Sequence, residues 1–159
     1  MNGDLSLIVP AVAAALREIA GIGTVLEYIP EALAAAPGQP VIVTAWPVVL
    51  IEPGEPTVSA KSNTREWRWP IHLTVLTGKR AGDSPAEIAA ALPWPERIVA
   101  KLDSKATFNG LLLATTTYGE PAVSSPTAGA AVGTFAFRDG SYVGTEIHAI
   151  CSVQRVGGF

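Results

Sequence analysis

The chain has 159 residues, of which 48 % are hydrophobic and only 16 % are charged, with a net charge of −3. This length suits one domain with a single core and argues against a two-domain enzyme. The acidic balance argues against bulk nucleic-acid binding and against a polybasic membrane anchor. The only cysteine, Cys151, excludes an internal disulfide framework and a multi-cysteine zinc site. Because a typical domain is about one-quarter charged, we expect other protein to cover much of this surface, and self-assembly is the working hypothesis.

The two best apolar stretches do not predict a membrane span. Residues 5–16 and 41–51 each contain a proline, and each is shorter than the roughly 18–20 residues that a spanning helix needs. Residues 1–4 contain no Lys or Arg, so the basic start of a signal peptide is missing. We therefore expect the protein to be made and kept in a cytoplasm.

The first predicted element is an amphipathic helix over residues 5–20. Its apolar side chains recur at helical spacing, and they are Ile8, Val12, Leu16 and Ile19. Pro10 is tolerated if it lies in the first turn, where its missing N–H costs little, and Gly21 supplies the stop.

Three strands and a loop follow this helix. Residues 24–28 are β-prone, and the β-branched run 41–51 predicts a strand that Pro47 places at a sheet edge or a bulge. Residues 52–63 contain two prolines and a glycine, which predicts a projecting loop or a ragged hairpin tip. In 66–77 apolar and polar residues alternate, as expected for a half-buried strand.

A second helix is predicted to begin at Pro85. Ser84 and Glu87 form a capping box in front of it, and Pro93-Trp94-Pro95 should kink or split it. Its apolar line is Ile88, Leu92, Ile98 and Leu102.

The C-terminal third is predicted to be β-structure. Strands at 111–118 and 132–138 flank a small-residue loop at 119–131, and Asp139-Gly140 is a favourable two-residue hairpin turn. One face of the strand after this turn carries Val143, Ile147, Ala149, Cys151 and Val153, and the other carries Tyr142, Glu146 and His148.

The order of these elements, α-β-β-β-α-β-β-β, predicts an α+β fold. We expect one domain over residues 1–159, with a mainly antiparallel or mixed sheet flanked by two main helices. Residues 52–63 and 119–131 would be its loops.

The sequence offers little for catalysis. His72 and His148 fall on the more polar faces of their strands, without the local serine, cysteine and acid arrangement of a triad, and are interpreted as surface or interface residues. His148 and Cys151 would point to opposite faces of a strand, which disfavours a metal site. Gly21-Ile22-Gly23 lacks the third glycine of a dinucleotide motif and follows a helix. We expect no enzyme, and no catalytic, cofactor-binding or metal site.

A basic stretch stands out within residues 61–80. Its cations are Lys61, Arg65, Arg68, Lys79 and Arg80. The stretch contains a single acid, Glu66, and the tryptophans Trp67 and Trp69. One interpretation is a basic, aromatic surface that contacts phosphate backbone or an acidic partner. The other is the solvated edge of a strand whose tryptophans belong to the core.

Short motifs along the chain form a recognisable layout. They are Ala20-Gly21-Ile22-Gly23, Tyr28-Ile29-Pro30, the proline-bounded strand 41–51 with its long following loop, Trp67-Arg68-Trp69-Pro70, Asp83-Ser84-Pro85, and Tyr142-Val143-Gly144 before Ile147. In this layout, over most of its length, the chain resembles the tail terminator (tail completion) proteins of long-tailed phages and related gene-transfer particles.

The resemblance implies a subunit of a hexameric ring on the last ring of tail tube protein. Such a ring stops tube polymerisation and offers a surface to the head connector, in a phage or phage-like particle assembled in a bacterial cytoplasm. The implied partners are copies of the chain, tail tube protein, a head-tail connector and passing DNA, with no membrane. Residues 52–63 and 119–131 would become ordered on contact with tube or connector, and the basic residues would face the DNA channel or an acidic neighbour.

Three alternatives remain open from the sequence. The first is a head-completion or neck adaptor of the same particle, bound to its portal. The second is a cytoplasmic ligand-binding module or small enzyme, which predicts a stable monomer with an apolar pocket and a few convergent polar groups. The third is a single-stranded nucleic-acid binder that uses the two tryptophans.

Overall fold

A computed structural model describes residues 5–33, 43–61, 64–80, 85–105, 114–117 and 133–156 and shows a mixed α+β fold, as predicted. The helices are α1 (Leu5–Arg17), α2 (Pro85–Ala91) and α3 (Trp94–Ser104). The strands are β1 (Thr24–Leu26), β2 (Val48–Pro53), β3 (Thr57–Lys61), β4 (Thr64–Lys79), β5 (Ala114–Thr117), β6 (Gly133–Phe137) and β7 (Gly140–Val156). The predicted loop 119–131 and the Ser84 side of the capping box lie outside the described residues.

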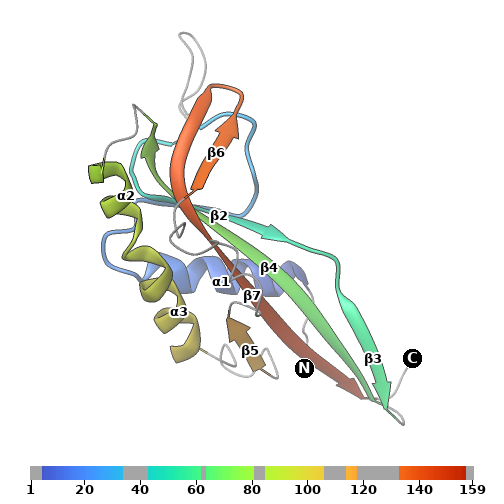
Figure 1. The fold of residues 1–159 in the computed structure, drawn as a ribbon. Helices are drawn as coiled ribbons and strands as arrows, with labels where there is room; N and C mark the ends of the chain where they lie inside the picture. Colours follow the sequence, from blue (N-terminus) through green and yellow to red (C-terminus); the bar gives the residue numbers. More distant parts are fainter. Residues whose placement is uncertain are drawn as a thin grey trace.

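The strands form one mixed, mainly antiparallel sheet. Its main order is β1-β2-β4-β7-β5, with β3 paired to β4 and β6 paired to β7. Strands β1 and β2 are parallel, and the other pairs are antiparallel. The long pair β4 and β7 forms the centre of the sheet, and Figure 1 shows it running diagonally through the whole molecule.

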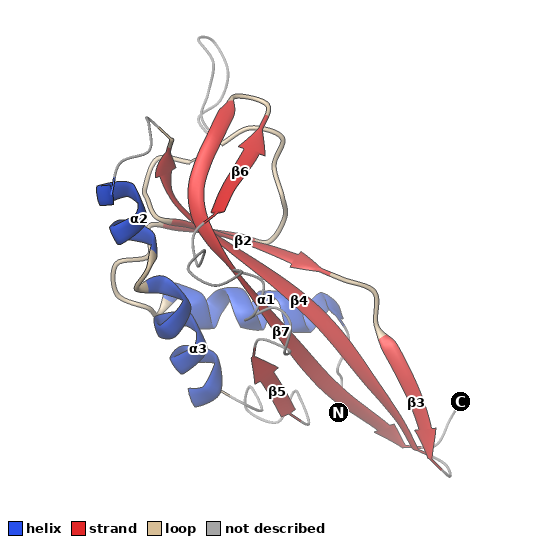
Figure 2. Cartoon of the chain, in the orientation of Figure 1, coloured by secondary structure: helices blue, strands red, loops and turns tan. Residues whose placement is uncertain are grey.

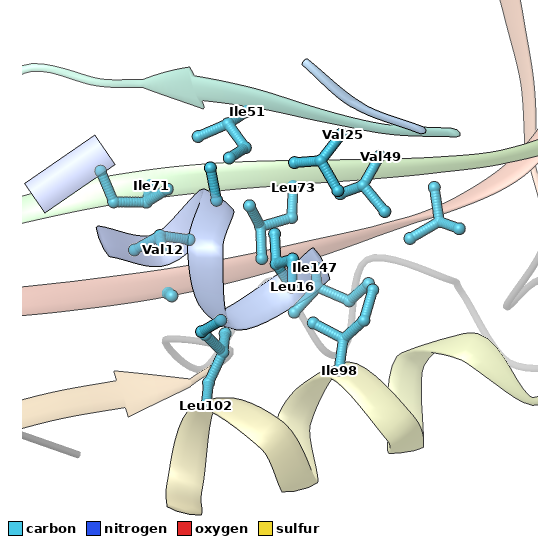
Figure 3. Close-up of a cluster of buried hydrophobic side chains, with 14 of the residues drawn as sticks. Val12, Leu16, Val25, Val49, Ile51, Ile71, Leu73, Ile98, Leu102 and Ile147 are labelled. Carbon is cyan, nitrogen blue, oxygen red and sulfur yellow. The ribbon is translucent and has the colours of Figure 1, made fainter. Parts of the chain in front are cut away.

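Helices α1 and α3 cover one face of the sheet, and the main core lies between them and the strands (Figure 3). The helical spacing places Ile8, Val12 and Leu16 inward, and the alternation in β4 and β7 supplies the facing layer. That layer includes Ile71, Leu73, Val75, Ile147, Ala149 and Cys151, all buried. The predicted core faces of the first helix and of both long strands are therefore confirmed.

A smaller apolar cluster lies on the other face of the sheet. It contains Leu33, Val43, Val48, Leu50, Leu76 and Tyr142. Side chains of Trp46, Phe135 and Phe137 pack against it, and Trp46 stacks on Tyr142 with ring centroids 5.4 Å apart. At this end of the sheet β2 is buried on both faces, which explains why its sequence is continuously apolar rather than alternating.

Beyond the helices, β3 and the adjoining ends of β4 and β7 form a projecting arm, which is visible at the lower right of Figure 2. Its hairpin pairs Thr57 with Arg68 and Lys61 with Thr64. The sequence predicted a loop or a ragged hairpin tip at 52–63, but residues 57–61 form a regular strand instead. Their pairing with β4 supplies the backbone partners that the local sequence did not reveal.

Proline positions account for two corrections near the N-terminus. Pro10 lies inside α1 rather than in its first turn, and the helix ends at Arg17. The strand predicted at 41–51 is β2, which begins at Val48, directly after Pro47. β2 is an internal strand between β1 and β4 rather than the predicted edge strand. Pro47 lies just before it, where the missing N–H removes no hydrogen bond from the ladder. The Pro47 carbonyl accepts hydrogen bonds from the backbone N–H groups of Gly23 and Thr24.

The second helix is split, as predicted. Helix α2 ends at Ala91, and α3 begins at Trp94. Ile98 and Leu102 are buried, whereas Ile88 and Leu92 are 49 % and 50 % exposed, so only the α3 half of the predicted apolar line reaches the core. The break at the prolines therefore separates the exposed Ile88 and Leu92 from the buried half of the predicted line.

The C-terminal hairpin is present with its turn shifted by one residue. Phe137 pairs with Gly140, so the two loop residues are Arg138 and Asp139 rather than Asp139 and Gly140. Gly140 opens β7 with a φ of 146°, a conformation that L side chains rarely adopt.

Candidate functional site

The helix-free face of the sheet brings together the two histidines of the chain. His72 on β4 and His148 on β7 are direct cross-strand partners. Their rings stack with centroids 4.1 Å apart and an interplanar angle of 17°. The sequence correctly placed each histidine on the more polar face of its strand, but it did not pair them, since strand register is set by distant packing.

Glu146 completes a three-residue cluster, which we call the His–Glu cluster (His72, Glu146 and His148). Glu146 lies two positions before His148 and therefore projects from the same face of β7. Its Oε1 atom is 2.9 Å from His148 Nε2 and 3.8 Å from His72 Nδ1. One ligand atom from each residue lies within 4.8 Å of the others. The three side chains are 30–38 % exposed, so they are held by the sheet and still reachable from solvent.

Two imidazoles and a carboxylate are a donor set that suits a divalent transition metal such as zinc. No metal site was predicted from the sequence, because the local spacing of His148 and Cys151 on a strand disfavours one. That pair is indeed separated: Cys151 is buried in the main core, whereas His148 lies on the opposite face. One sequence signal could have suggested the cluster. Each histidine lies in a strand of alternating apolar and polar residues, and an acid lies two residues from His148 on the same face.

Next to the His–Glu cluster the same face carries an open pocket of about 710 Å³. Leu50, Thr74 and Glu146 are consecutive cross-strand partners on β2, β4 and β7, and all three line it. Phe135 and Phe137 of β6 line the pocket as well. The ligand-binding alternative from the sequence analysis would use this pocket.

The wall of the pocket is held by contacts between the β6–β7 turn and residues 31–33. Asp139 accepts a hydrogen bond from the backbone N–H of Leu33 at 3.2 Å and another from the hydroxyl of Tyr142. The backbone N–H of Arg138 donates to the carbonyl of Glu31 at 2.8 Å. Burial raises the pKa of the Tyr142 hydroxyl, and its hydrogen bond to Asp139 adds to the increase.

Tyr142→Phe is expected to lower the free energy of unfolding by about 1–2 kcal/mol, because it removes a hydrogen bond to a charged acceptor that keeps other partners. Stability of the wild type should also fall as pH rises above about 10, since the folded state retains a phenol proton that the unfolded chain loses. That loss should be smaller in the variant. Urea denaturation across pH tests both effects, with Tyr28→Phe as the control because Tyr28 is 57 % exposed. Equal midpoints for the two variants would contradict the expectation.

The predicted basic residues do not form one surface. Arg65 and Arg68 lie on the arm, and Lys61 ends β3 there, whereas Lys79 and Arg80 lie at the far end of β4. A strand rises about 3.3 Å per residue, so Arg68 and Lys79 are on the order of 35 Å apart. Sequence proximity was misleading because the two groups of cations lie near opposite ends of the 16-residue strand β4.

The two groups of cations also differ in their contacts. Arg68 forms an ion pair with Glu66 at 3.1 Å on the arm. Lys79 Nζ donates to the carbonyl of Asp139 at 3.0 Å, and Arg80 Nη1 donates to Thr134 Oγ1 at 2.7 Å. Lys79 and Arg80 therefore hold the β6–β7 hairpin.

Trp67 and Trp69 are partly buried and pack against the main core. Their rings are stacked with centroids 6.0 Å apart and an interplanar angle of 14°. This arrangement favours the interpretation that the tryptophans belong to the core. It disfavours their use as open platforms for nucleic-acid bases.

Comparison with known proteins gives no match: the chain matches no protein-family model and no curated protein. Among the described helices, none combines the length and apolar character needed to cross a membrane.

Proposed function

We propose that this chain is a structural subunit that forms a ring with copies of itself and caps the tail tube of a phage-type particle. The ring stops tube polymerisation and offers a joining surface to the head connector. The proposal begins from the resemblance to tail terminator proteins. The observation that carries it is the projecting arm, because a strand pair that extends beyond the helices suits contact with a neighbouring subunit.

The arm has both a backbone edge and an apolar side chain available for such contact. Among the described residues β3 pairs with β4 alone, so its other edge is suited to accept a strand from another chain. Val58 is the second residue of this edge strand, lies opposite Trp67, and is 46 % exposed. A regular edge strand with an exposed β-branched residue favours assembly.

Further apolar side chains are exposed away from the arm. Tyr28 and Ile29 are 57 % and 43 % exposed, and Ile88 of α2 and Leu92, which follows α2, are about half exposed. A subunit with neighbours on several sides would cover these residues. The same arrangement accounts for a surface that carries little charge, since charged residues are depleted in the centres of protein interfaces.

The arm is tested with Val58→Asp, which should weaken ring assembly without unfolding the subunit, because a carboxylate would be buried at the contact. Thr57→Asp is the matched control, since it adds the same charge to the other face of β3, opposite Arg68. The measurements are the solution mass by light scattering and the length of tubes assembled from the tail tube protein of the particle. The wild type and the control should form rings and shorten tubes, and the Val58 variant should do neither.

Two outcomes would overturn the proposal. Tubes of unchanged length in the presence of wild-type protein would exclude the capping role. Capture of portal-side protein in preference to tube protein would place the chain at the neck of the particle, as in the first alternative. Charge reversal at Lys79 or Arg80 is unsuitable for this test, because it would break the hydrogen bonds that hold the β6–β7 hairpin.

A further inference from the structure

We propose that the His–Glu cluster binds a zinc ion on the helix-free face of the sheet, with His72, Glu146 and His148 as its protein ligands. The inference is independent of the proposed function, because it rests on side chains of the helix-free face and uses neither the arm nor a partner subunit. Zinc bound at this site would stabilise the face of the sheet that carries the pocket.

The first support is the rigidity of the positions. His72 and His148 are paired in register within the longest ladder of the sheet, with hydrogen-bonded neighbours on both sides of the pair. Ligands on paired strands are positioned more accurately than ligands on loops. Glu146 shares the backbone of β7 with His148, so all three ligands come from two strands whose relative position the core fixes.

The second support is the spacing of the donor atoms. A tetrahedral zinc ion lies about 2.0–2.2 Å from nitrogen and oxygen ligands, which places neighbouring donors about 3.3–3.5 Å apart. The two distances from Glu146 Oε1, 2.9 Å to His148 and 3.8 Å to His72, lie on either side of this value. Small side-chain rotations would therefore bring the three donors onto one ion.

The third support is the charge around the cluster. Glu52 is the cross-strand partner of His72 on β2. Glu31, Glu52 and Glu146 all line the adjoining pocket, against the single cation Arg138 among its lining residues. This excess of carboxylates favours a cation at the edge of the pocket.

The donor types select the class of ion. Calcium and magnesium prefer oxygen ligands throughout, whereas imidazole nitrogen suits zinc and related transition metals. Two histidines and one glutamate leave one tetrahedral position open, as in zinc sites that keep a water or bind a ligand. Glu146 belongs to both the cluster and the pocket lining, so the site lies at the edge of the pocket.

The test uses the full chain without a polyhistidine tag, stripped of metal with a chelator and returned to buffer. Zinc affinity is measured by competition with a chromogenic chelator, and cobalt replaces zinc to report coordination by its visible absorption. We expect one ion per chain and the absorption of four-coordinate cobalt. His72→Gln and His148→Gln should each lower zinc affinity by more than about 100-fold. Loss of a residue that only hydrogen-bonds to a metal ligand already lowers metal affinity roughly 10–100-fold.

Glu66→Gln is the matched control, because it removes a carboxylate from β4 that lies away from the cluster and pairs with Arg68. Its affinity should equal that of the wild type, and zinc should raise its melting temperature equally. Glu146→Gln, which keeps the side-chain shape, serves if a histidine variant fails to fold. The proposal is overturned if the wild type binds no zinc, or if its affinity is unchanged in the folded cluster variants.

Discussion

Gly144→Ala is expected to destabilise the protein by about 3 kcal/mol or more, at the upper end of what overpacking costs. A Cβ atom at this position would lie 2.0 Å from the carbonyl oxygen of Val75 and 2.8 Å from a methyl carbon of Leu76. Gly144 pairs with Leu76, where the register of β4 and β7 begins to shift. The neighbouring backbone therefore has to move, and with it the central ladder of the sheet.

Gly78→Ala is the matched control, because it adds the same methyl group on β4 just beyond the register shift, where nothing lies within 4 Å of the added atom. Its free energy of unfolding, measured in urea, should stay within about 0.5 kcal/mol of the wild-type value, as for most surface substitutions. If both variants unfold at the wild-type midpoint, the close approach of β4 to β7 at Gly144 is refuted.

Leu16→Ala is expected to cost about 2–5 kcal/mol, because it leaves a cavity where the surrounding structure can relax only in part. Leu16 is fully buried in the main core, and Figure 3 shows it beside Leu73 and Ile147 and facing α3. The loss should appear as a lower urea midpoint with an unchanged slope, the signature of altered stability alone.

Leu7→Ala tests the same change on the other side of α1. Leu7 is 42 % exposed, and alanine is at least as good a helix former as leucine. The free energy of unfolding of the variant should therefore lie within about 0.5 kcal/mol of the wild-type value. A loss at Leu7 as large as that at Leu16 would contradict the assignment of the buried face of this helix.

The arm and the His–Glu cluster lie on different parts of the sheet, so their tests are independent. Val58→Asp addresses the edge strand β3, and His148→Gln addresses the helix-free face of β7. A ring that forms without zinc and a cluster that binds zinc in a monomer are both compatible with the structure. Together the two tests separate the proposed assembly role from the proposed zinc site.

Local patterns determined most of the secondary structure. The spacing in α1 and the alternation in β4 and β7 depend only on helix and strand geometry, and each predicted face was found where the sequence placed it. Pro93-Trp94-Pro95 also acted locally, as the predicted break between α2 and α3. The predicted apolar line did not reach the core at Ile88 and Leu92. A periodic pattern does not show whether another element packs on it.

By itself, the sequence determined an α+β domain with little surface charge, the residues that form its main core, and a polar face for each histidine. The tertiary structure alone decided that β2 is internal, that 57–61 is a strand, and that the basic residues lie at opposite ends of β4. It also decided that His72 meets His148 beside Glu146. The reason is that residue periodicity assigns a side chain to a face, whereas the packing of distant segments selects which strands are neighbours and in which register they pair.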